Sequence, residues 1–197
     1  MWNDRYSTPD YVYGTEPNDF LAAVATRIVP GGRVLSIADG EGRNGVYLAG
    51  LGFDVTTVDS SPVGVAKAQR LAESRGVHIN PIVPDLAEFE IAADSWDGIV
   101  SIFCHLPPPL RRRVHQQVVR GLAPGGLYVL EGYSVQQLNH GTGGPKSAEL
   151  LLTLEAVRAE LEGLELIHAV EMEREVNEGA LHWGLSAVVQ VIAAKPG

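Results

Sequence analysis

Apolar residues recur along the chain in two different spacings. Short runs rich in β-branched residues predict buried strands at residues 34–38, 53–58, 77–83, 96–103 and 127–133. Between them, apolar positions three or four residues apart predict helices at residues 17–28, 44–50, 61–76, 110–122 and 150–161. Strands that alternate with helices are typical of an α/β fold whose sheet is mainly parallel.

The last part of the chain has a different pattern. Apolar residues alternate with charged or small residues at 164–172 and again at 181–191, which is the period of a half-buried strand. Asn177, Glu178 and Gly179 lie between the two runs and suit a tight turn. The sequence therefore predicts a closing hairpin, which adds an antiparallel strand to an otherwise parallel sheet.

The composition narrows the class of protein. The chain has 197 residues, 45% of them hydrophobic and 20% charged, as expected for a single globular domain. The net charge of −9 disfavours nucleic acid as a partner, and the basic run at 111–113 is interpreted as a solvated helix face. With one cysteine and six scattered histidines, no metal site is expected. No long apolar run or signal peptide is present, so we expect a cytoplasmic protein without a membrane partner.

A glycine-rich loop follows the first predicted strand. Residues 40–45 read Gly-Glu-Gly-Arg-Asn-Gly, which fits the G-x-G-x-x-G pattern between a strand and a helix. Asp59 ends the next predicted strand, where a carboxylate can accept hydrogen bonds from ribose hydroxyls. This pattern fits a nicotinamide dinucleotide as well as S-adenosylmethionine, and a tight turn without a ligand is a third interpretation.

Four features favour S-adenosylmethionine. Asp39 and Glu41 make the loop acidic, which repels a diphosphate but suits an ammonium and a sulfonium. Asp85 follows the third predicted strand, where its carboxylate could accept a hydrogen bond from an adenine amino group. The closing hairpin suits a methyltransferase sheet. No residues are left for the substrate domain that a dehydrogenase normally needs.

At this point the sequence resembles the class I S-adenosylmethionine-dependent methyltransferases. Within them it is similar to a bacterial group related to the tellurite-resistance and thiopurine methyltransferases. The resemblance covers nearly the whole chain. It rests on six motifs, which read Trp-Asn-Asp-Arg-Tyr at 2–6, Tyr-Gly-Thr-Glu-Pro-Asn at 13–18, Gly-Glu-Gly-Arg-Asn at 40–44, Asp-Ser-Ser at 59–61, Ala-Pro-Gly-Gly-Leu at 123–127 and Thr-Gly-Gly-Pro at 142–145.

The resemblance implies a Rossmann-like methyltransferase fold with a seven-stranded, mostly parallel sheet, an antiparallel last strand and helices on both faces. It implies a single methyltransferase domain over residues 1–197, in which an N-terminal aromatic arm and helix, residues 1–30, cover the cofactor site. The residues assigned to the cofactor are Arg5, Tyr11, Asp39, Gly40, Gly42, Asn44, Asp59, Ser60, Asp85, Leu86 and Phe103.

Within that set, the loop at 40–44 would lie against the methionine part of the cofactor. Asp59 would hold the ribose, Asp85 and Leu86 the adenine, and Arg5 or Tyr11 would close over the methionine end. The first strand departs from the family pattern. Ser36 and Ala38 stand where the family commonly has an acid and a glycine, and Asp39 is a candidate to replace the missing carboxylate.

The methyl acceptor is expected beyond the carboxyl ends of the fourth and fifth strands. His105 is a candidate general base and Tyr133 a second candidate catalytic residue, whereas Cys104 is interpreted as a packed side chain. Thr142 and Gly143 belong to a glycine-rich loop that could line or cover the substrate.

The sequence thus predicts a monomeric or homodimeric enzyme that transfers a methyl group from S-adenosylmethionine to a small molecule, by in-line displacement. An NAD(P)-dependent oxidoreductase, a non-catalytic S-adenosylmethionine-binding protein and a macromolecular methyl acceptor stay open as alternatives.

Overall fold

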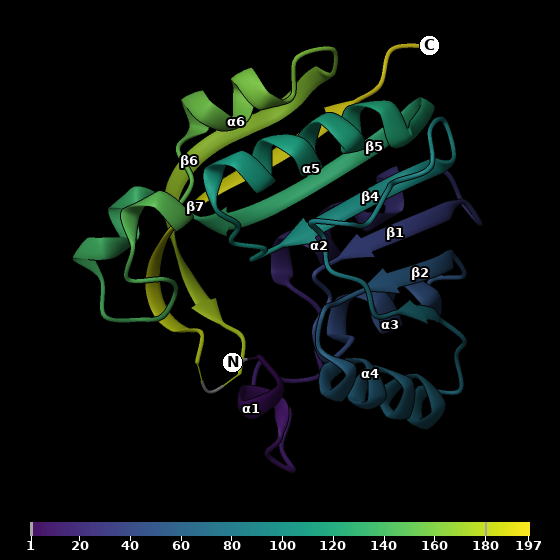
Figure 1. Cartoon of the computed structure of the whole chain (residues 1–197), viewed down its shortest axis with the longest axis vertical. Coiled ribbons are helices and arrows are strands. Elements are labelled where there is room, and N and C mark those ends of the chain that lie inside the picture. Colours follow the sequence, from purple (N-terminus) through teal and green to yellow (C-terminus); the bar gives the residue numbers. More distant parts are fainter. Residues whose placement is uncertain (1, 180) are drawn as a thin grey trace.

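A seven-stranded sheet forms the centre of the molecule (Figure 1). The computed structural model describes residues 2–179 and 181–197. The strand order is β3-β2-β1-β4-β5-β7-β6, and β7 is antiparallel to both of its neighbours while β1 to β5 are parallel. This confirms the predicted fold class. The strands are β1 (Arg33–Ile37), β2 (Asp54–Val58), β3 (Asn80–Ile82), β4 (Trp96–Ile102), β5 (Leu122–Tyr133), β6 (Glu165–Asn177) and β7 (Trp183–Ala194).

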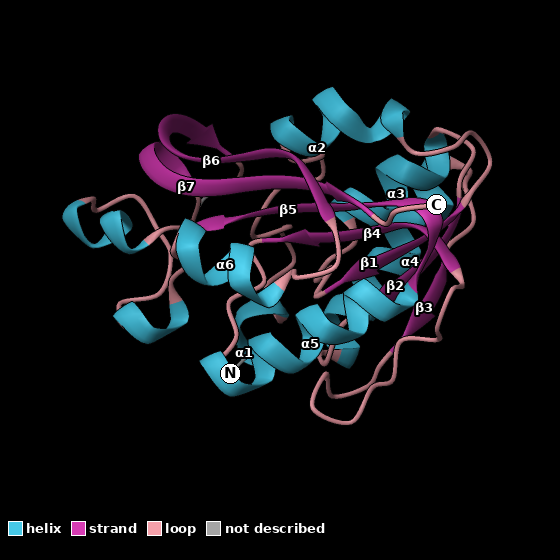
Figure 2. Ribbon diagram, turned by 90° about the horizontal axis from the view of Figure 1, so that it is seen from above, coloured by secondary structure: helices cyan, strands magenta, loops and turns pink. Residues whose placement is uncertain are grey.

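Helices cover both faces of the sheet (Figure 2). One face packs against α2 (Asp19–Val24), α3 (Arg43–Gly50) and α4 (Pro62–Arg75), and the other against α5 (Pro108–Gly121) and α6 (Leu154–Glu160). A short N-terminal helix, α1 (Trp2–Tyr6), lies against α4. Three 3-10 turns complete the described elements: η1 (Ala25–Arg27), η2 (Val135–Asn139) and η3 (Ala148–Leu150).

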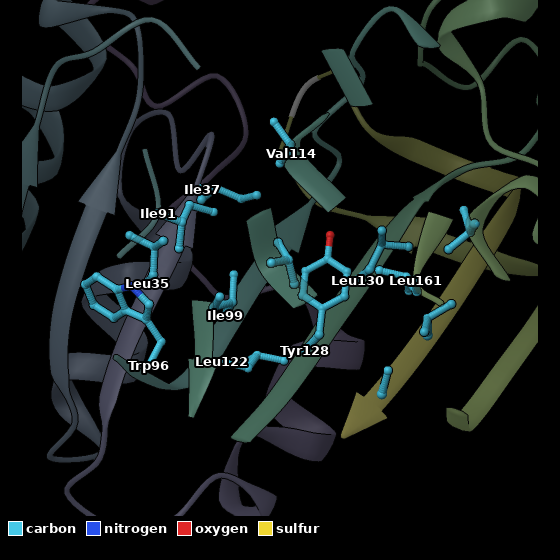
Figure 3. Packing of buried hydrophobic residues seen from close by; sticks show 14 of the residues in the cluster. Leu35, Ile37, Ile91, Trp96, Ile99, Val114, Leu122, Tyr128, Leu130 and Leu161 are labelled. Carbon is cyan, nitrogen blue, oxygen red and sulfur yellow. The ribbon is translucent and has the colours of Figure 1, made fainter. Parts of the chain in front are cut away.

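The larger apolar core lies between the sheet and the α5–α6 face (Figure 3). Tyr128 and Leu130 of β5 pack there with Val114 of α5 and Leu161 of α6, and all four are nearly or fully inaccessible to solvent. The burial of such large side chains supplies the main driving force for folding. It also fixes β5, whose carboxyl end carries Tyr133.

Local sequence signals explain where several helices begin and end. Ser61 caps α4 by accepting the N–H of Gly64 at 3.1 Å, and Gly76 ends the helix in a left-handed conformation, at the two ends of the helix predicted for residues 61–76. The helix predicted at 17–28 is shorter, because Asn18 is the N-cap of α2 and η1 follows it. Pro17 therefore precedes the cap and is not in the first turn.

Other boundaries also differ from the sequence-based expectation. The third strand is only three residues long and contains Pro81, which has no N–H to give to a ladder. β5 begins at Leu122, before the Pro-Gly-Gly turn, and continues past a register shift. The last helix begins at Leu154, because Thr153 caps it by accepting the N–H of Ala156. None of the described helices is long and apolar enough to span a membrane.

Candidate cofactor and acceptor site

The glycine-rich loop joins β1 to α3 at the carboxyl edge of the sheet. Gly40 and Gly42 have φ angles of 60° and 92°, in the left-handed region that other residues avoid. A Cβ atom on Gly42 would also lie 2.5 Å from the Cβ of Ala68 in α4. The loop therefore needs glycine at this position for conformation and for packing. Its close fit brings backbone N–H groups to the edge where β1 and β2 end.

Two buried carboxylates flank this loop. Asp39 follows β1 and accepts hydrogen bonds from the Ser36 hydroxyl at 2.7 Å and from the Gly45 N–H at 3.1 Å. Asp59 follows β2 and accepts from the N–H groups of Gly40 and Ser61, at 2.9 and 2.8 Å. The carboxylates keep further lone pairs for a ligand.

Burial controls the charge of both groups. Desolvation raises the pKa of Asp39 to about 7; the nearby Asp59 adds to this rise, and the hydrogen bond from Ser36 opposes it. Desolvation likewise raises the pKa of Asp59. Two neighbouring buried acids favour a cation between or beside them, because a positive charge offsets both desolvation and mutual repulsion.

The backbone at Ala38 shows why glycine is the common residue of the family at this position. Ala38 has a φ of 53°, one of three positive values among the described non-glycine residues. A left-handed conformation costs an L-residue roughly 1–2 kcal/mol, which is why glycine suits this position. β1 itself contains no acid at the family position. The hydrogen bond from Ser36 instead holds the carboxylate of Asp39, which follows the strand.

Glu41 has a different role from the one its charge suggested. Its carboxylate forms a buried ion pair with Lys67 at 2.6 Å and accepts the N–H of Val12 at 2.8 Å. Lys67 also donates to the carbonyl of Asp10. Glu41 is thus neutralised within the protein and anchors the N-terminal arm, so that Asp39 and Asp59 are the acids left to face a cationic ligand.

The N-terminal arm contacts the loop through Tyr6. Cβ atoms on Gly40 and Gly64 would lie 2.7 and 2.9 Å from atoms of its ring and hydroxyl, and Tyr6 is 4% exposed. Burial and the nearby Asp59 raise the pKa of its hydroxyl, which stays protonated. Tyr6 was not among the predicted site residues, because more than thirty residues of chain separate it from the loop that it contacts.

The two arm residues that were predicted to contact the cofactor make other contacts. Arg5 donates to the Tyr13 hydroxyl at 2.9 Å and lies over the ring of Trp2, 4.8 Å from its centroid. The Tyr11 hydroxyl donates to the backbone carbonyl of Lys67 at 3.0 Å. These contacts hold the arm across α4 and leave the cofactor role of Arg5 and Tyr11 a prediction.

The remaining predicted cofactor residues lie along the same edge of the sheet. Asn44 is buried at the start of α3 and accepts the N–H of Asn18 at 2.9 Å. Ser60 is exposed after β2. Asp85 is exposed after β3 and accepts the N–H of Ala87 at 2.8 Å, while Leu86 packs into the larger core.

Five rings gather at the carboxyl ends of β4 and β5, where the acceptor was expected. Phe103 directly follows β4, and its ring centroid lies 4.6 Å from that of Tyr133 and 4.7 Å from that of His182. Tyr13 lies 4.5 Å from His182, and His105 stacks on Tyr133 at 5.6 Å. The arm, two central strands and the β6–β7 hairpin therefore meet at one place.

Polar atoms within this ring cluster are left without partners. The Tyr133 hydroxyl and the Nδ1 atom of His182 are buried and have no hydrogen-bond partner among the described residues. Burial raises the pKa of Tyr133 and lowers that of His182 to about 3, so both side chains are uncharged near neutral pH. His182 was not among the predicted site residues, because its place in the site depends on the fold of the hairpin.

Both ring nitrogens of His105, the fifth ring of this cluster, are occupied. Its Nδ1 is 2.9 Å from the carbonyl oxygen of Leu150, and its Nε2 accepts the N–H of Tyr133 at 3.4 Å. Burial lowers its pKa to about 4, against the opposing effect of the Leu150 carbonyl. To act as a base, His105 would have to release the Tyr133 N–H.

The loop that contains Thr142 and Gly143 is tied to the hairpin. The Thr142 hydroxyl donates to the carbonyl of Leu185 at 2.8 Å, and the Gln137 amide donates to both Thr142 and Gly143. The same loop lies against Tyr133, since a Cβ on Gly143 would be 3.1 Å from the Tyr133 hydroxyl. It thus covers one side of the ring cluster.

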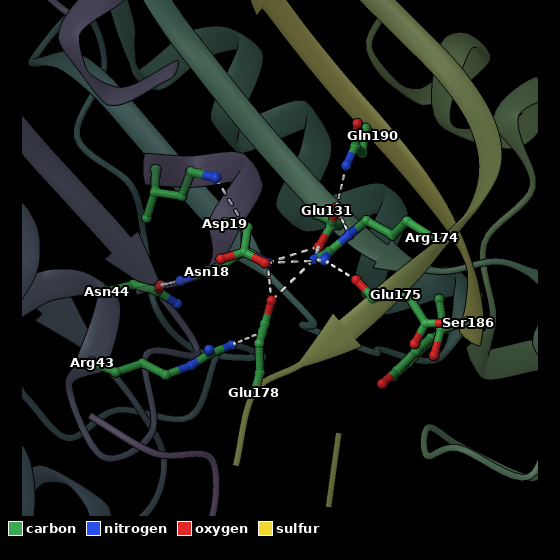
Figure 4. Close-up of polar contacts among 12 residues, drawn as sticks. Asn18, Asp19, Arg43, Asn44, Glu131, Arg174, Glu175, Glu178, Ser186 and Gln190 are labelled. Atoms are coloured by element: carbon green, nitrogen blue, oxygen red, sulfur yellow. Dashed lines mark hydrogen bonds and ion pairs between the residues drawn. The ribbon is translucent and has the colours of Figure 1, made fainter. Parts of the chain in front are cut away.

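A buried network of charges joins these parts (Figure 4). Glu131 of β5 is ion-paired with Arg174 of β6, which also contacts Glu178 at 3.0 Å. Asn18 donates to both carboxylates, at 2.7 and 2.8 Å, and Gln190 of β7 donates to Glu131 at 2.5 Å. Among the described residues there is no group of three or more side chains suited to a metal ion.

Comparison with known proteins agrees with this geometry. Residues 34–126 match the family described as a methyltransferase domain. A tRNA (uracil(54)-C(5))-methyltransferase of Pyrococcus abyssi is 28% identical over 128 residues, which are 60% of this chain and 30% of the relative. A 2-heptyl-1-hydroxyquinolin-4(1H)-one methyltransferase of Mycobacteroides abscessus is 29% identical over 102 residues, 50% of this chain and 45% of the relative.

The third relative is similar in both sequence and structure. It is the probable S-adenosyl-L-methionine-dependent methyltransferase TehB of Haemophilus influenzae, which is 32% identical over 77 residues, or 39% of this chain and 27% of the relative. The crystal structure of TehB from Haemophilus influenzae superposes with a TM-score of 0.71 and 19% identity, covering 98% of this chain and 65% of that one. In sequence, this chain spans less than half the length of each of the three relatives.

The chain is similar to the class I S-adenosylmethionine-dependent methyltransferases. The similarity lies in the order of the strands, in the matched domain and in the loop with its two acids. More particularly, the chain is similar to the tellurite-resistance group, to which TehB belongs, as the sequence motifs indicated. The predicted enzyme class and cofactor agree with these comparisons.

Proposed function

We propose that this protein binds S-adenosylmethionine at the edge of β1 and β2 and catalyses methyl transfer to a small-molecule acceptor. The observation that carries the proposal is the pair of buried acids, Asp39 and Asp59, on either side of Gly40 in a methyltransferase-type sheet. S-adenosylmethionine supplies an electrophilic methyl group on a positively charged sulfur. Its charges suit this acidic edge, whereas the phosphates of a dinucleotide do not.

The chain's own residues would divide the binding work. Asp59 would accept hydrogen bonds from the ribose hydroxyls while the Gly40 and Ser61 N–H groups hold its carboxylate in place. Asp39 would face the ammonium group, held by Ser36 and Gly45. Tyr6 would cover the loop and keep water from it.

The ring cluster would form the acceptor side of the site. Phe103 supplies an apolar surface, and the unpartnered Tyr133 hydroxyl and His182 Nδ1 could hydrogen-bond to an acceptor. Aligning a nucleophile with the methyl group in a dry pocket is the main catalytic task. A base is needed only if the acceptor must lose a proton, and His105 is the proposed base in that case.

Two measurements test the proposal. Isothermal titration with S-adenosylhomocysteine should give a 1:1 complex, and NAD should not bind. Incubation with methyl-labelled S-adenosylmethionine and fractions of a cell extract should label a small molecule. Binding of NAD without binding of S-adenosylhomocysteine would overturn the proposal in favour of an oxidoreductase.

Two outcomes would change its scope. Binding of S-adenosylhomocysteine without label transfer to any fraction would favour a non-catalytic S-adenosylmethionine-binding protein. Transfer of label to the RNA fraction would place the acceptor among nucleic acids, against the expectation from the net charge of −9.

A further inference from the structure

The side chains of the glycine-rich loop are held by three different parts of the fold. Glu41 pairs with Lys67 of α4, and Asn44 accepts the backbone N–H of Asn18 at the start of α2. Arg43, the third side chain, extends in the other direction. It reaches the tip of the β6–β7 hairpin. In the described part of the chain, this tip comprises residues 177–179 and 181–183.

The contact between Arg43 and the hairpin tip is a buried ion pair (Figure 4). The Arg43 Nη2 atom lies 2.5 Å from a Glu178 carboxylate oxygen, and the two side chains are 8% and 3% exposed. The other terminal nitrogen of Arg43, Nη1, is buried without a hydrogen-bond partner among the described residues. Among the described residues, this guanidinium therefore donates a hydrogen bond to Glu178 alone, which sets its orientation.

Glu178 is itself held firmly. Its carboxylate accepts hydrogen bonds from Arg174 at 3.0 Å and from Asn18 at 2.8 Å, and its N–H donates to the carbonyl of His182 at 2.7 Å. The next residue, Gly179, packs against the arm, because a Cβ there would lie 2.5 Å from the backbone of Tyr13. Several contacts from different segments thus hold Glu178 and Gly179 in place.

The buried charges of this network balance, and the further carboxylate near Arg174, that of Asp19 at 3.6 Å, is exposed. Two buried carboxylates, Glu131 and Glu178, face two guanidinium groups, Arg43 and Arg174. Removing the charge of Glu178 leaves Arg43 buried and unpaired, which favours its movement toward another anion or toward water. Arg43 begins α3 directly after Gly42, so its movement would carry the loop with it.

We propose that Glu178 is a positioning residue, which fixes Arg43 and so sets the conformation of the glycine-rich loop that binds the cofactor. The hairpin then contributes to cofactor affinity although none of its side chains is assigned to the cofactor. This inference rests on the proposed function, because it concerns the affinity of the same site.

The test compares two buried glutamates of similar surroundings. Glu178→Gln should weaken S-adenosylhomocysteine binding roughly tenfold in isothermal titration, the order of magnitude of coupling between linked sites. The matched control is Glu160→Gln. Glu160 pairs with Arg111 and His115 on the α5–α6 face of the sheet and is 6% exposed. Glu160→Gln should lower the melting temperature without changing the dissociation constant for S-adenosylhomocysteine.

Kinetics and a second substitution separate positioning from stability. Once an acceptor is known, Glu178→Gln should raise the KM for S-adenosylmethionine more than it lowers kcat. Arg43→Met should weaken binding by itself but add little to the effect of Glu178→Gln, because both changes remove one interaction. If Glu178→Gln does not fold, Arg43→Lys gives the same comparison, since it keeps the charge but loses the planar donor geometry.

The outcomes distinguish the two proposals. A folded wild-type protein that binds no S-adenosylhomocysteine would overturn the proposed function. A wild-type protein that binds it, with a Glu178→Gln variant of unchanged affinity, would overturn only the positioning role of Glu178.

Discussion

The hydroxyl of Ser36 donates a hydrogen bond of 2.7 Å to the carboxylate of Asp39, across the bend at Ala38. This bond connects the carboxyl end of β1 to the acid that follows the strand. It shows how a chain that lacks an acid within the strand can still present a carboxylate at the same edge. The chemistry of the candidate site depends first on the protonation of this group.

Cofactor affinity should therefore depend on pH through Asp39. Its pKa is raised to about 7, so the free protein carries a proton there below neutral pH, whereas a bound ammonium favours the carboxylate. Binding of S-adenosylhomocysteine should tighten about tenfold between pH 6 and pH 8, as one proton is released. Isothermal titration in buffers of different ionisation enthalpy would measure that proton.

Asp39→Asn is the control for this dependence. It should bind more weakly and with an affinity that does not change over the same range. His105 and His182, with pKa values lowered to about 4 and 3, do not titrate between pH 6 and pH 8. A wild-type affinity that is constant over this range would contradict the assignment of Asp39.

The same shift should affect folding. Because the folded pKa of Asp39 lies above its ordinary value of 3.8, its contribution to stability is present at low pH and is lost as pH rises toward about 7. Chemical denaturation of the free protein should show a smaller decrease in the free energy of unfolding from pH 4 to pH 7 in Asp39→Asn than in the wild type. An identical decrease in both proteins would exclude Asp39 as its source.

Ala38→Gly should stabilise the protein by about 1 kcal/mol, because glycine adopts a φ of 53° without the steric cost of a Cβ. Ala66→Gly, in the interior of α4, should instead cost about 1 kcal/mol, since glycine is a poor helix former. Thermal and chemical denaturation would measure both changes. Equal losses in the two variants would show that the strain at Ala38 is negligible.

Asp59→Asn should reduce the affinity for S-adenosylhomocysteine by about 10- to 100-fold, the value of one or two hydrogen bonds to a charged acceptor. Asp54→Asn is the matched control, because Asp54 lies exposed at the other end of β2. Its affinity should equal that of the wild type. If both variants bind equally well, Asp59 does not contact the ribose.

Glu160→Gln should lower the free energy of unfolding by about 3–5 kcal/mol at pH 7, since it leaves Arg111 buried without its partner. Although burial alone would raise the pKa of Glu160, hydrogen bonds from His115 and Arg111 lower it to about 2. Its contribution is therefore present above the ordinary pKa of 4.5 and disappears as pH falls through 2. Wild type and variant should converge in stability toward pH 2, and a constant difference would contradict this origin.

Much of the fold could be predicted because its signals are local. The β-branched runs gave the strands, and Ser61 with Gly76 defined both ends of α4. The edge strand β6 was harder, since exposed Ile167 and Met172 lie among polar residues and alternation ends before Asn177. Its length is set by pairing with β7, which no local pattern records.

The site was predictable only in part for the same reason. Asp39, Gly40 and Asp59 follow strands and could be placed from their positions in the chain. Tyr6, Glu178 and His182 could not, because each reaches the site from a segment far away in sequence. The acidic character of the loop was predicted, but Lys67, which neutralises Glu41, comes from a neighbouring helix.

The ion pair between Arg43 and Glu178 joins residues 135 positions apart. During synthesis, the loop emerges from the ribosome long before the glutamate that orients it, because the chain is made from its N-terminus onward. A nascent chain that has not yet reached the hairpin would hold an unpaired Arg43 and a poorly ordered loop. We therefore expect the nascent chain to bind the ligand more weakly until the β6–β7 hairpin has formed, so that full affinity is reached only late in synthesis.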